Sequence, residues 1–421
     1  MISPRNSAAS DTHPGNRVDK RSAISFDVAI ARHDAIPAKA CQVPPMKHTV
    51  STDLSFMRRA IVLARRGFGR TSPNPCVGAV IARGRRILGE GWHRAAGQPH
   101  AEVEAIRDAQ RHGHHDLRGA TLFVTLEPCS TPGRTPPCTD AILAANLRRV
   151  VVGAVDPNPA HAGRGLRLLR RAGVRVSRSS LAAECIALNE AWNRWIVTKR
   201  PWVVAKVAMT LDGKIATASG ASRWITGKRA RRVAHQFRAE SDAVLVGVGT
   251  LLADNPSLTA RDARGRSLPR QPLRVILDSM ARTPTKSRAL VSPGGGTVLA
   301  VARSAPEARI RRLEAAGARI LRTSSPSGRP DPRHLLRSLG RLGVVRLLVE
   351  GGAEVLASFF EARLVDEVAF FIAPRILGGV SAKHAVAGDG FFRWHLGPAI
   401  EDLRLTRVGS DLLARGRAAP S

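Results

Sequence analysis

The sequence contains no tyrosine, and phenylalanine and tryptophan together bring its aromatic content to only 4% of 421 residues. Aromatic platforms for stacking single-stranded nucleic acid would therefore be sparse. Acidic residues are also scarce, because 33 Asp and Glu stand against 66 Lys and Arg, a formal net charge of +33. Such a charge suits phosphate binding, but the basic residues are spread over the whole chain and form no single stripe. We therefore expect small phosphorylated molecules as partners and disfavour nucleic acid.

Long apolar runs and abundant cysteine are missing as well. No segment is apolar enough to span a bilayer, and no basic-then-apolar stretch resembles a signal peptide. Five cysteines do not suggest a disulfide framework. We expect a cytoplasmic protein that is long enough for two or three domains, each with its own core. A homo-oligomer is compatible with the sequence, which does not set the oligomeric state.

What the sequence does contain is a pattern of zinc ligands: His100-Ala101-Glu102, then Glu127-Pro128-Cys129, then Pro136-Pro137-Cys138. One imidazole and two thiolates hold zinc and leave its fourth position open, which distinguishes a catalytic zinc from a structural one. Zinc in such a site activates a water molecule. Glu102 is placed to move protons between that water and a leaving amine, as in zinc nucleobase deaminases.

The segments around these residues favour the same site. Residues 100–111 read as an amphipathic helix, and residues 121–126 read as a buried strand that runs into Pro128-Cys129. Cys138 precedes a predicted helix start, where the helix dipole favours the thiolate. Two buried cysteines and an unrelated histidine would be the simpler interpretation, but the coincidence of the three motifs favours zinc.

The spacing of the two cysteines narrows the class. Many deaminases that act on nucleic acid carry Pro-Cys-x-x-Cys, whereas here the proline-braced residues 130–137 separate the cysteines. With Thr-Ser-Pro-Asn-Pro-Cys-Val-Gly at 71–78 and Asp-Pro-Asn-Pro at 156–159, the region resembles the deaminase half of the RibD family of bifunctional riboflavin-biosynthesis proteins. The resemblance continues through a second domain and covers roughly residues 51 to 415.

The resemblance implies a hydrolytic deamination of a diaminopyrimidinone that carries a ribosylamino 5′-phosphate. Glu102 would take a proton from water and deliver it to the departing ammonia. The family commonly has histidine two residues after the first zinc cysteine, where this chain has Thr131, so a donor to the ring is lost or replaced. The residues matched to substrate contacts in this domain are Asn74, His93, Arg134, Asp156 and Asn158.

The implied fold class is α/β. We expect a disordered extension over residues 1–50, with Met46 as a candidate initiator, and a cytidine-deaminase-like three-layer domain over 51–198. A dihydrofolate-reductase-like domain would follow over 199–415, with a tail at 416–421. The junction is predicted at 192–201. No Gly-x-Gly-x-x-Gly follows the first strand of the second domain, which disfavours a Rossmann domain.

Alternating strands and helices are predicted in the second domain, as in a layered α/β fold. The expected strands are 202–208, 243–248, 274–277, 298–302, 345–350 and 367–372, and the expected helices are 229–237, 308–315 and 353–361. Four clusters stand out, at residues 206–214, 222–226, 247–261 and 349–354. In the last, Gly351-Gly352 at a strand-to-helix turn would let backbone N–H groups approach an anion. Taken singly each cluster is ordinary turn chemistry, but their order resembles the RibD reductase domain.

That resemblance implies NADPH as the second cofactor, one zinc ion being the first. The matched NADPH contacts are Ala208, Trp224, Thr226, Thr250, Asp254, Ser279, Gly352, Ala353, Glu354, Val355, Leu356, Ala357 and Ser358. The matched substrate contacts are Lys206, Ser222, Arg238, Leu258, Arg261 and Glu350. Arg238 and Arg261 are suited to clamp a phosphate bidentately, and Lys206 and Asp254 to polarise or protonate the sugar carbonyl.

Two other functions are kept open by the residues alone. A nucleic-acid base deaminase would use the same zinc ligands, but the cysteine spacing and the second domain count against it. A zinc-stabilised scaffold without activity would not require Glu102 or Lys206.

Overall fold

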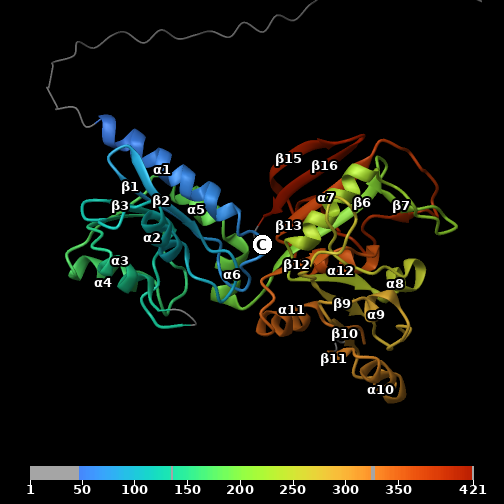
Figure 1. The fold of residues 1–421 in the computed structure, drawn as a ribbon. Helices are drawn as coiled ribbons and strands as arrows, with labels where there is room; N and C mark the ends of the chain where they lie inside the picture. Colours follow the sequence, from blue (N-terminus) through green and yellow to red (C-terminus); the bar gives the residue numbers. More distant parts are fainter. Residues whose placement is uncertain (1–46, 134–135, 324–327, 420–421) are drawn as a thin grey trace, which may run out of the picture. The chain divides into compact units, whose positions relative to one another are not determined.

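The computed structural model describes residues 47–133, 136–323 and 328–419 (Figure 1). Two predictions made from the sequence therefore lie outside the described residues: most of the N-terminal extension, and Arg134 with its substrate contact. Helix α1 begins at Lys47, so the last residues of the predicted extension are helical.

The first domain is built on a five-stranded sheet of order β2-β1-β3-β4-β5, in which β1 is antiparallel to both neighbours and β3, β4 and β5 are parallel. Its elements are α1 (Lys47–Arg65), β1 (Gly78–Arg83), β2 (Arg86–Trp92), α2 (Ala101–Arg111), β3 (Thr121–Leu126), α3 (Cys138–Ala144), β4 (Arg149–Ala154), α4 (Arg164–Arg171), β5 (Arg175–Arg178), α5 (Ala182–Ala187) and α6 (Glu190–Thr198).

Side chains of this sheet alternate between two apolar clusters. Along β1, Ala79 and Ile81 join the cluster that α2, α3 and α4 cover, whereas Val80 and Ala82 join the cluster that α1, α5 and α6 cover. Alternation with a period of two is what a strand with both faces buried requires. The result is the predicted three-layer arrangement, helices on both faces of one sheet.

The second domain contains a nine-stranded sheet of order β11-β10-β9-β8-β12-β6-β13-β16-β15 and a short β14-β7 ladder. Its elements are β6 (Trp202–Thr210), β7 (Lys214–Ala216), α7 (Lys228–Ala239), β8 (Ala243–Gly247), α8 (Val248–Asp254), β9 (Leu273–Leu277), α9 (Arg288–Val291), β10 (Thr297–Val301), α10 (Glu307–Ala315), β11 (Arg319–Arg322), α11 (Pro332–Arg341), β12 (Arg346–Val349), α12 (Ala353–Glu361), β13 (Glu367–Ala373), β14 (Lys383–His384), η1 (Trp394–Leu396), β15 (Ile400–Val408) and β16 (Asp411–Ala418).

Seven strands of the large sheet, from β11 to β13, run parallel, and β16 and β15 close it in the antiparallel sense. Helices α7 to α10 cover one face and α11 with α12 cover the other. Because parallel strands end at one edge, the residues that follow β8, β9 and β12 gather there. Strand β16 reaches Ala418, so three residues of the predicted tail pair with β13 and β15.

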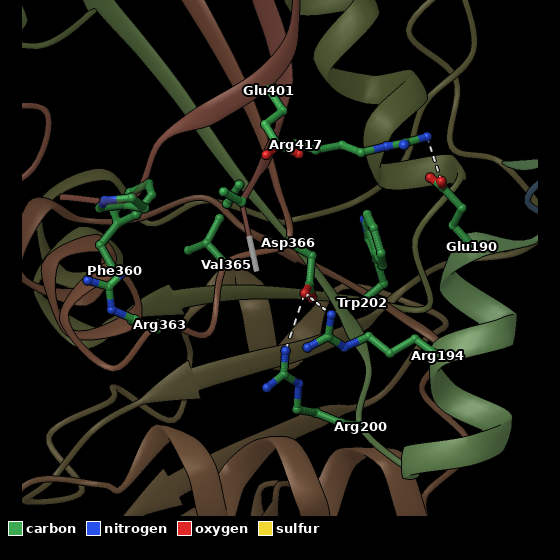
Figure 2. Close-up of a pocket in the computed structure, with 13 residues that line it drawn as sticks. Glu190, Arg194, Arg200, Trp202, Phe360, Arg363, Val365, Asp366, Glu401 and Arg417 are labelled. Atoms are coloured by element: carbon green, nitrogen blue, oxygen red, sulfur yellow. Dashed lines mark hydrogen bonds and ion pairs between the residues drawn. The ribbon is translucent and has the colours of Figure 1, made fainter. Parts of the chain in front are cut away.

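The predicted junction at 192–201 is mostly helix α6, and its arginines engage the start of β13. Figure 2 shows Asp366 between the guanidinium groups of Arg194 and Arg200, in a cavity of about 410 Å³. The Arg200 Nη2 lies 3.2 Å from the Asp366 carboxylate, and the backbone N–H of Val203 donates to the same group at 2.8 Å. Asp366 therefore fixes the segment that leads from α6 into β6.

No helix among the described residues is both long and apolar enough to cross a membrane.

Candidate active sites

The three predicted zinc ligands lie together in the first domain. His100 is the residue before α2, Cys129 lies in the loop after β3, and Cys138 is the first residue of α3. The His100 Nδ1 is 3.3 Å from the Cys138 Sγ and 3.5 Å from the Cys129 Sγ. All three donor atoms lie within 4.8 Å of one another.

This donor set fits zinc. With bonds of about 2.0–2.3 Å, a tetrahedral zinc ion separates its nitrogen and sulfur donors by about 3.6–3.8 Å, close to the distances found here. The backbone N–H of Cys138 donates to the Cys129 Sγ at 3.3 Å and so supports a thiolate there. A nitrogen and two sulfurs leave one position for water, which is the arrangement of a catalytic site.

The hydrogen bond between the two cysteines shifts their pKa values in opposite directions. The hydrogen bond to Cys138 and the imidazole of His100 lower the pKa of the Cys129 thiol to about 4, against the opposing effect of burial. The pKa of Cys138 is raised, chiefly by its hydrogen bond with Cys129. Glu102, in the first turn of α2, is 3% exposed. Burial raises the pKa of Glu102 to about 7, and the negative charge of Cys129 acts in the same direction. A carboxyl group that titrates near neutrality can both accept and donate a proton.

Asn74 and His93 also line this cavity, which measures about 340 Å³. The Asn74 Nδ2 donates to the His93 Nε2 at 3.1 Å, and the His93 Nδ1 donates to the Pro99 carbonyl at 3.1 Å. Both nitrogens of His93 are therefore engaged, and burial lowers its pKa. The neutral ring holds the amide of Asn74 toward the cavity, so His93 positions Asn74.

The loop after β4 supplies Asp156 and Asn158 to the same cavity. Its position depends on Glu127, whose carboxylate accepts the backbone N–H groups of Asp156 at 3.2 Å, Gly163 at 2.9 Å and Gly165 at 2.9 Å. A Cβ at Gly165 would lie 2.2 Å from the Pro128 carbonyl oxygen. The Glu-Pro-Cys motif thus holds both a zinc ligand and the opposite wall of the site.

Several residues that line the cavity were not predicted from the sequence, among them His161, Trp192 and Trp195. The tryptophans come from α6, which the sequence predicted as a junction. Their spacing of three residues is a helical signal that could have placed them on one face. His161 follows the recognised Asp-Pro-Asn-Pro motif, and nothing in its immediate sequence indicated that it turns back toward Thr131.

The second site lies at the edge where parallel strands of the large sheet end. Val349, the last residue of β12, pairs with Ala205 of β6 and Leu245 of β8. Glu350 follows β12 directly, at the level of Lys206, the next residue of β6. Ligands of open α/β sheets bind at this edge, so the structure brings the predicted strand-end residues together where a cofactor is expected.

A buried ion pair between Arg238 and Glu350 lies at this edge of the sheet. The Nε and Nη2 of Arg238 each lie 2.7 Å from a carboxylate oxygen of Glu350, and the Arg238 Nη1 donates to the Thr259 carbonyl at 3.1 Å. Burial by itself would raise the pKa of Glu350, but Arg238 and Lys206 outweigh it and lower that pKa to about 2. Burial lowers the pKa of Lys206 despite Glu350. Three of the five N–H groups of Arg238 are therefore engaged within the protein.

Two glycine-containing turns adjoin the ion pair and fit the phosphates of a dinucleotide. The Gly247 N–H donates to the Gly351 carbonyl at 2.9 Å, which joins the turn after β8 to the turn after β12. A Cβ at Gly352 would lie 3.3 Å from the Thr250 Oγ1, so a side chain there would fill the space between the turns. Gly352 is the N-cap of α12, whose first N–H groups lack partners within the helix. NADPH therefore fits this edge, where residues 352–358 are predicted to contact it.

Three other predicted NADPH residues lie in the loop before α7 or at the end of α8. Trp224 is 68% exposed, and the Arg231 guanidinium lies 4.3 Å from its ring centroid. Thr226 is buried, and its carbonyl accepts from the Arg231 Nη1 at 2.7 Å. The Asp254 carbonyl accepts from the Arg223 Nη2 at 2.5 Å. The structure thus connects the loop before α7 with the end of α8.

The remaining predicted residues are dispersed around this edge. Ala208 lies in β6 opposite Phe371 of β13, and Ser279 follows β9 and accepts the Ala302 N–H at 3.0 Å. Ser222 is half-buried in the loop before α7, and Leu258 is 1% exposed with a φ of 52°.

Arg261 is half-buried and hydrogen bonded to Thr259 Oγ1 at 3.2 Å. It lines a cavity of about 680 Å³ to which Arg229, Arg232 and Arg407 also contribute. A concentration of four guanidinium groups favours a phosphate ligand.

Comparison with known families agrees with this division into two sites. The family described as the cytidine and deoxycytidylate deaminase zinc-binding region matches residues 50–154, which contain the three zinc ligands. The family described as the RibD C-terminal domain matches residues 201–414, which contain the glycine turns and the Arg238–Glu350 pair.

Whole-chain relatives share both parts. The riboflavin biosynthesis protein RibD of Actinobacillus pleuropneumoniae is 40% identical over 371 residues, covering 88% of this chain and 96% of its own. That of Escherichia coli strain K12 is 38% identical, with 86% and 98% covered. A solved RibD structure from Acinetobacter baumannii superposes with a TM-score of 0.78 at 35% identity, covering 88% of this chain and 99% of that one. A bifunctional deaminase/reductase from Thermotoga maritima gives 0.75 at 36%, with 88% and 100% covered. The chain belongs to the RibD family of riboflavin biosynthesis proteins.

Proposed function

We propose that this chain catalyses two consecutive reactions of riboflavin biosynthesis. The first is the zinc-dependent hydrolytic deamination of 2,5-diamino-6-(5-phosphoribosylamino)pyrimidin-4(3H)-one. The second is the NADPH-dependent reduction of the ribosyl chain, which gives 5-amino-6-(5-phosphoribitylamino)uracil. The observation that carries this proposal is the cluster of His100, Cys129 and Cys138 beside a cavity that Glu102 also lines. The same chain has a glycine-lined site at the edge of a parallel sheet.

In the first reaction, zinc supplies a water molecule whose pKa is lowered toward neutrality. His100, Cys129 and Cys138 would hold the metal. Glu102 takes the proton of the water and delivers it to the leaving amine, a role that its buried position and pKa of about 7 support. Asn74, held by His93, offers an amide to the pyrimidine edge.

Two further residues of the cavity bind the rest of the deaminase substrate. Asp156 and Asn158 lie on the opposite wall, where they contact the ring or the ribosylamino chain. Arg134, in the loop between the two cysteines, is proposed to contact the same part of the substrate.

In the second reaction, NADPH supplies the hydride and the protein orients both reactants. The turns after β8 and β12 and the first turn of α12 would bind the cofactor phosphates. Thr250, Ala208, Trp224, Thr226, Asp254 and Ser279 complete the proposed cofactor contacts.

The proposed substrate contacts at the second site are Lys206, Glu350, Arg261, Ser222 and Leu258. Lys206 lies next to Glu350, where its ammonium can polarise the sugar carbonyl. Three of the five N–H groups of Arg238 already bond to Glu350 and Thr259. Arg261 is therefore the better candidate for the main phosphate ligand. Asp254 is proposed to assist protonation.

We also place the boundary between the two activities near residue 198, with deaminase residues at 51–198 and reductase residues at 199–415. A cytoplasmic location is part of the proposal, and small phosphorylated molecules are favoured over nucleic acid as partners.

The test is to incubate the purified chain with the diaminopyrimidine substrate and identify the products by mass spectrometry. Without NADPH, the product should carry oxygen in place of one amino group. With NADPH, that product should gain two hydrogen atoms. Reduction without prior deamination, or no reaction in either condition, would contradict the proposed order or the proposed function.

A further inference from the structure

The described residues that line the cavity of the first domain carry few groups able to bind the phosphate of the proposed substrate. Among the described residues that line it, none is lysine or arginine. Three histidines line the cavity. His100 belongs to the zinc cluster, and both ring nitrogens of His93 are hydrogen bonded. His161 is therefore the one lining histidine, within the described part of the chain, that has a ring nitrogen left for a ligand.

The imidazole of His161 is held by Thr131, a residue of the loop that follows the zinc ligand Cys129. The His161 Nδ1 lies 3.4 Å from the Thr131 Oγ1. The described residues offer no hydrogen-bond partner to the His161 Nε2. When the threonine hydroxyl donates to Nδ1, the proton of the neutral ring resides on Nε2, so that Nε2 is a donor.

The backbone around His161 is fixed by hydrogen bonds. Its N–H donates to the Asn158 carbonyl at 2.8 Å, and its carbonyl accepts the Arg164 N–H at 2.8 Å. The same loop is held against the Glu-Pro-Cys motif by the carboxylate of Glu127. His161 therefore projects from a braced turn, and little conformational entropy is lost when it binds a ligand.

We propose that His161 is a substrate-binding residue of the deaminase site and that its Nε2 donates a hydrogen bond to the phosphate of the ribosylamino chain. Thr131 is the positioning residue that orients the ring. This inference rests on the proposed function, because it assigns a contact within the same reaction.

The test is steady-state deamination by the intact, zinc-loaded His161→Ala variant. Losing one hydrogen bond to a charged group should raise KM for the phosphorylated substrate about tenfold and leave kcat unchanged. The dephosphorylated substrate, used as a competitive inhibitor, should bind the variant as well as it binds the unaltered protein. The matched control is His112→Ala, because His112 is an exposed histidine after α2, with 66% of its side chain accessible. It should show unaltered KM and kcat.

A second variant tests the spatial argument. Because the Thr131 hydroxyl contacts the His161 imidazole, Thr131→Val alone should raise KM for the phosphorylated substrate by leaving the ring unoriented. Adding Thr131→Val to His161→Ala should cause no further rise, because Thr131 acts only through His161.

An unchanged KM in His161→Ala, or a fall in kcat alone, would overturn the inference, and so would equal weakening of the phosphorylated and dephosphorylated compounds. If the unaltered protein itself releases no ammonia, the proposed function fails. If it does and the variant behaves normally, only the role of His161 is refuted.

Discussion

Breaking the buried pair formed by Arg238 and Glu350 should destabilise the second domain, and Glu350→Gln tests this. The side chains of the two residues are 16% and 8% exposed and share two contacts of 2.7 Å. Glutamine keeps the shape of glutamate but leaves the guanidinium without a counter-charge. Removing one partner of a buried pair costs about 3–5 kcal/mol.

The pKa of Glu350 leads to a similar magnitude. Its value of about 2, against an ordinary value of 4.5, corresponds to about 3 kcal/mol of preference for the charged form. For a domain of this size, about 3 kcal/mol lowers the melting temperature by roughly 6–12 °C. Differential scanning calorimetry of the intact chain measures this shift in the transition of the second domain.

An exposed pair supplies the control. Glu307 contacts Arg322 at 2.6 Å, but their side chains are 54% and 42% exposed. Glu307→Gln should therefore cost less than about 1 kcal/mol and lower the melting temperature by at most a few degrees.

The destabilisation caused by Glu350→Gln should decrease as the pH falls. Because the pKa of Glu350 is lower in the folded protein than in the unfolded chain, its stabilising contribution is complete above about pH 4.5. The contribution is lost as the pH falls toward about 2. The difference between the parent protein and Glu350→Gln should shrink over that interval. Equal melting temperatures for Glu350→Gln and the parent near pH 7, or a difference that does not change with pH, would refute this reasoning.

Three further outcomes are expected. Cys129→Ser should reduce bound zinc, measured by atomic emission, and abolish ammonia release. Reduction of the deaminated substrate should continue, and full zinc occupancy would contradict the ligand assignment. Arg261→Ala should raise the reductase KM for the phosphorylated substrate about thirtyfold or more and leave the NADPH affinity unchanged, whereas Asp254→Ala should weaken NADPH binding; identical phenotypes would refute the separation of their roles. Burial, with Arg238 nearby, lowers the pKa of His235 to about 4, so stability should rise between about pH 4 and 6.5, by about 1–2 kcal/mol after solvent screening. His235→Asn should flatten that part of the stability curve in urea titrations.

The zinc site could be predicted from the sequence because its chemistry is local. His100 and Glu102 open one helix, and Cys129 follows a buried strand, so short motifs contain most of the geometry. The opposite wall of the cavity could not be predicted in the same way. His161 and Trp192 reach the site through tertiary contacts that no local pattern encodes, and α6 was interpreted as a junction.

In the second domain, too, local patterns could be predicted from the sequence and long-range contacts could not. Six of the seven parallel strands were predicted because strands buried on both faces are nearly continuous apolar runs. The seventh, β11, was missed because it is short and begins and ends with exposed arginines. Strand β15 was missed because its residues are almost all exposed and include charged side chains. The pairing of Arg238 with Glu350 was also beyond the sequence, since 112 residues separate them, and it changes the expectation that Arg238 is a free phosphate clamp.

The central claim is that one chain contains two separate active sites, and Glu102→Gln tests it most directly. The amide cannot take up and release the proton, so ammonia release should fall by about 10²–10⁴-fold. The three zinc ligands are untouched, so the zinc content should remain at one ion per chain. Supplied with the deaminated intermediate, the variant should oxidise NADPH at the rate of the parent protein. Normal ammonia release by Glu102→Gln, or loss of both activities in a variant that is folded and zinc-loaded, would contradict the account.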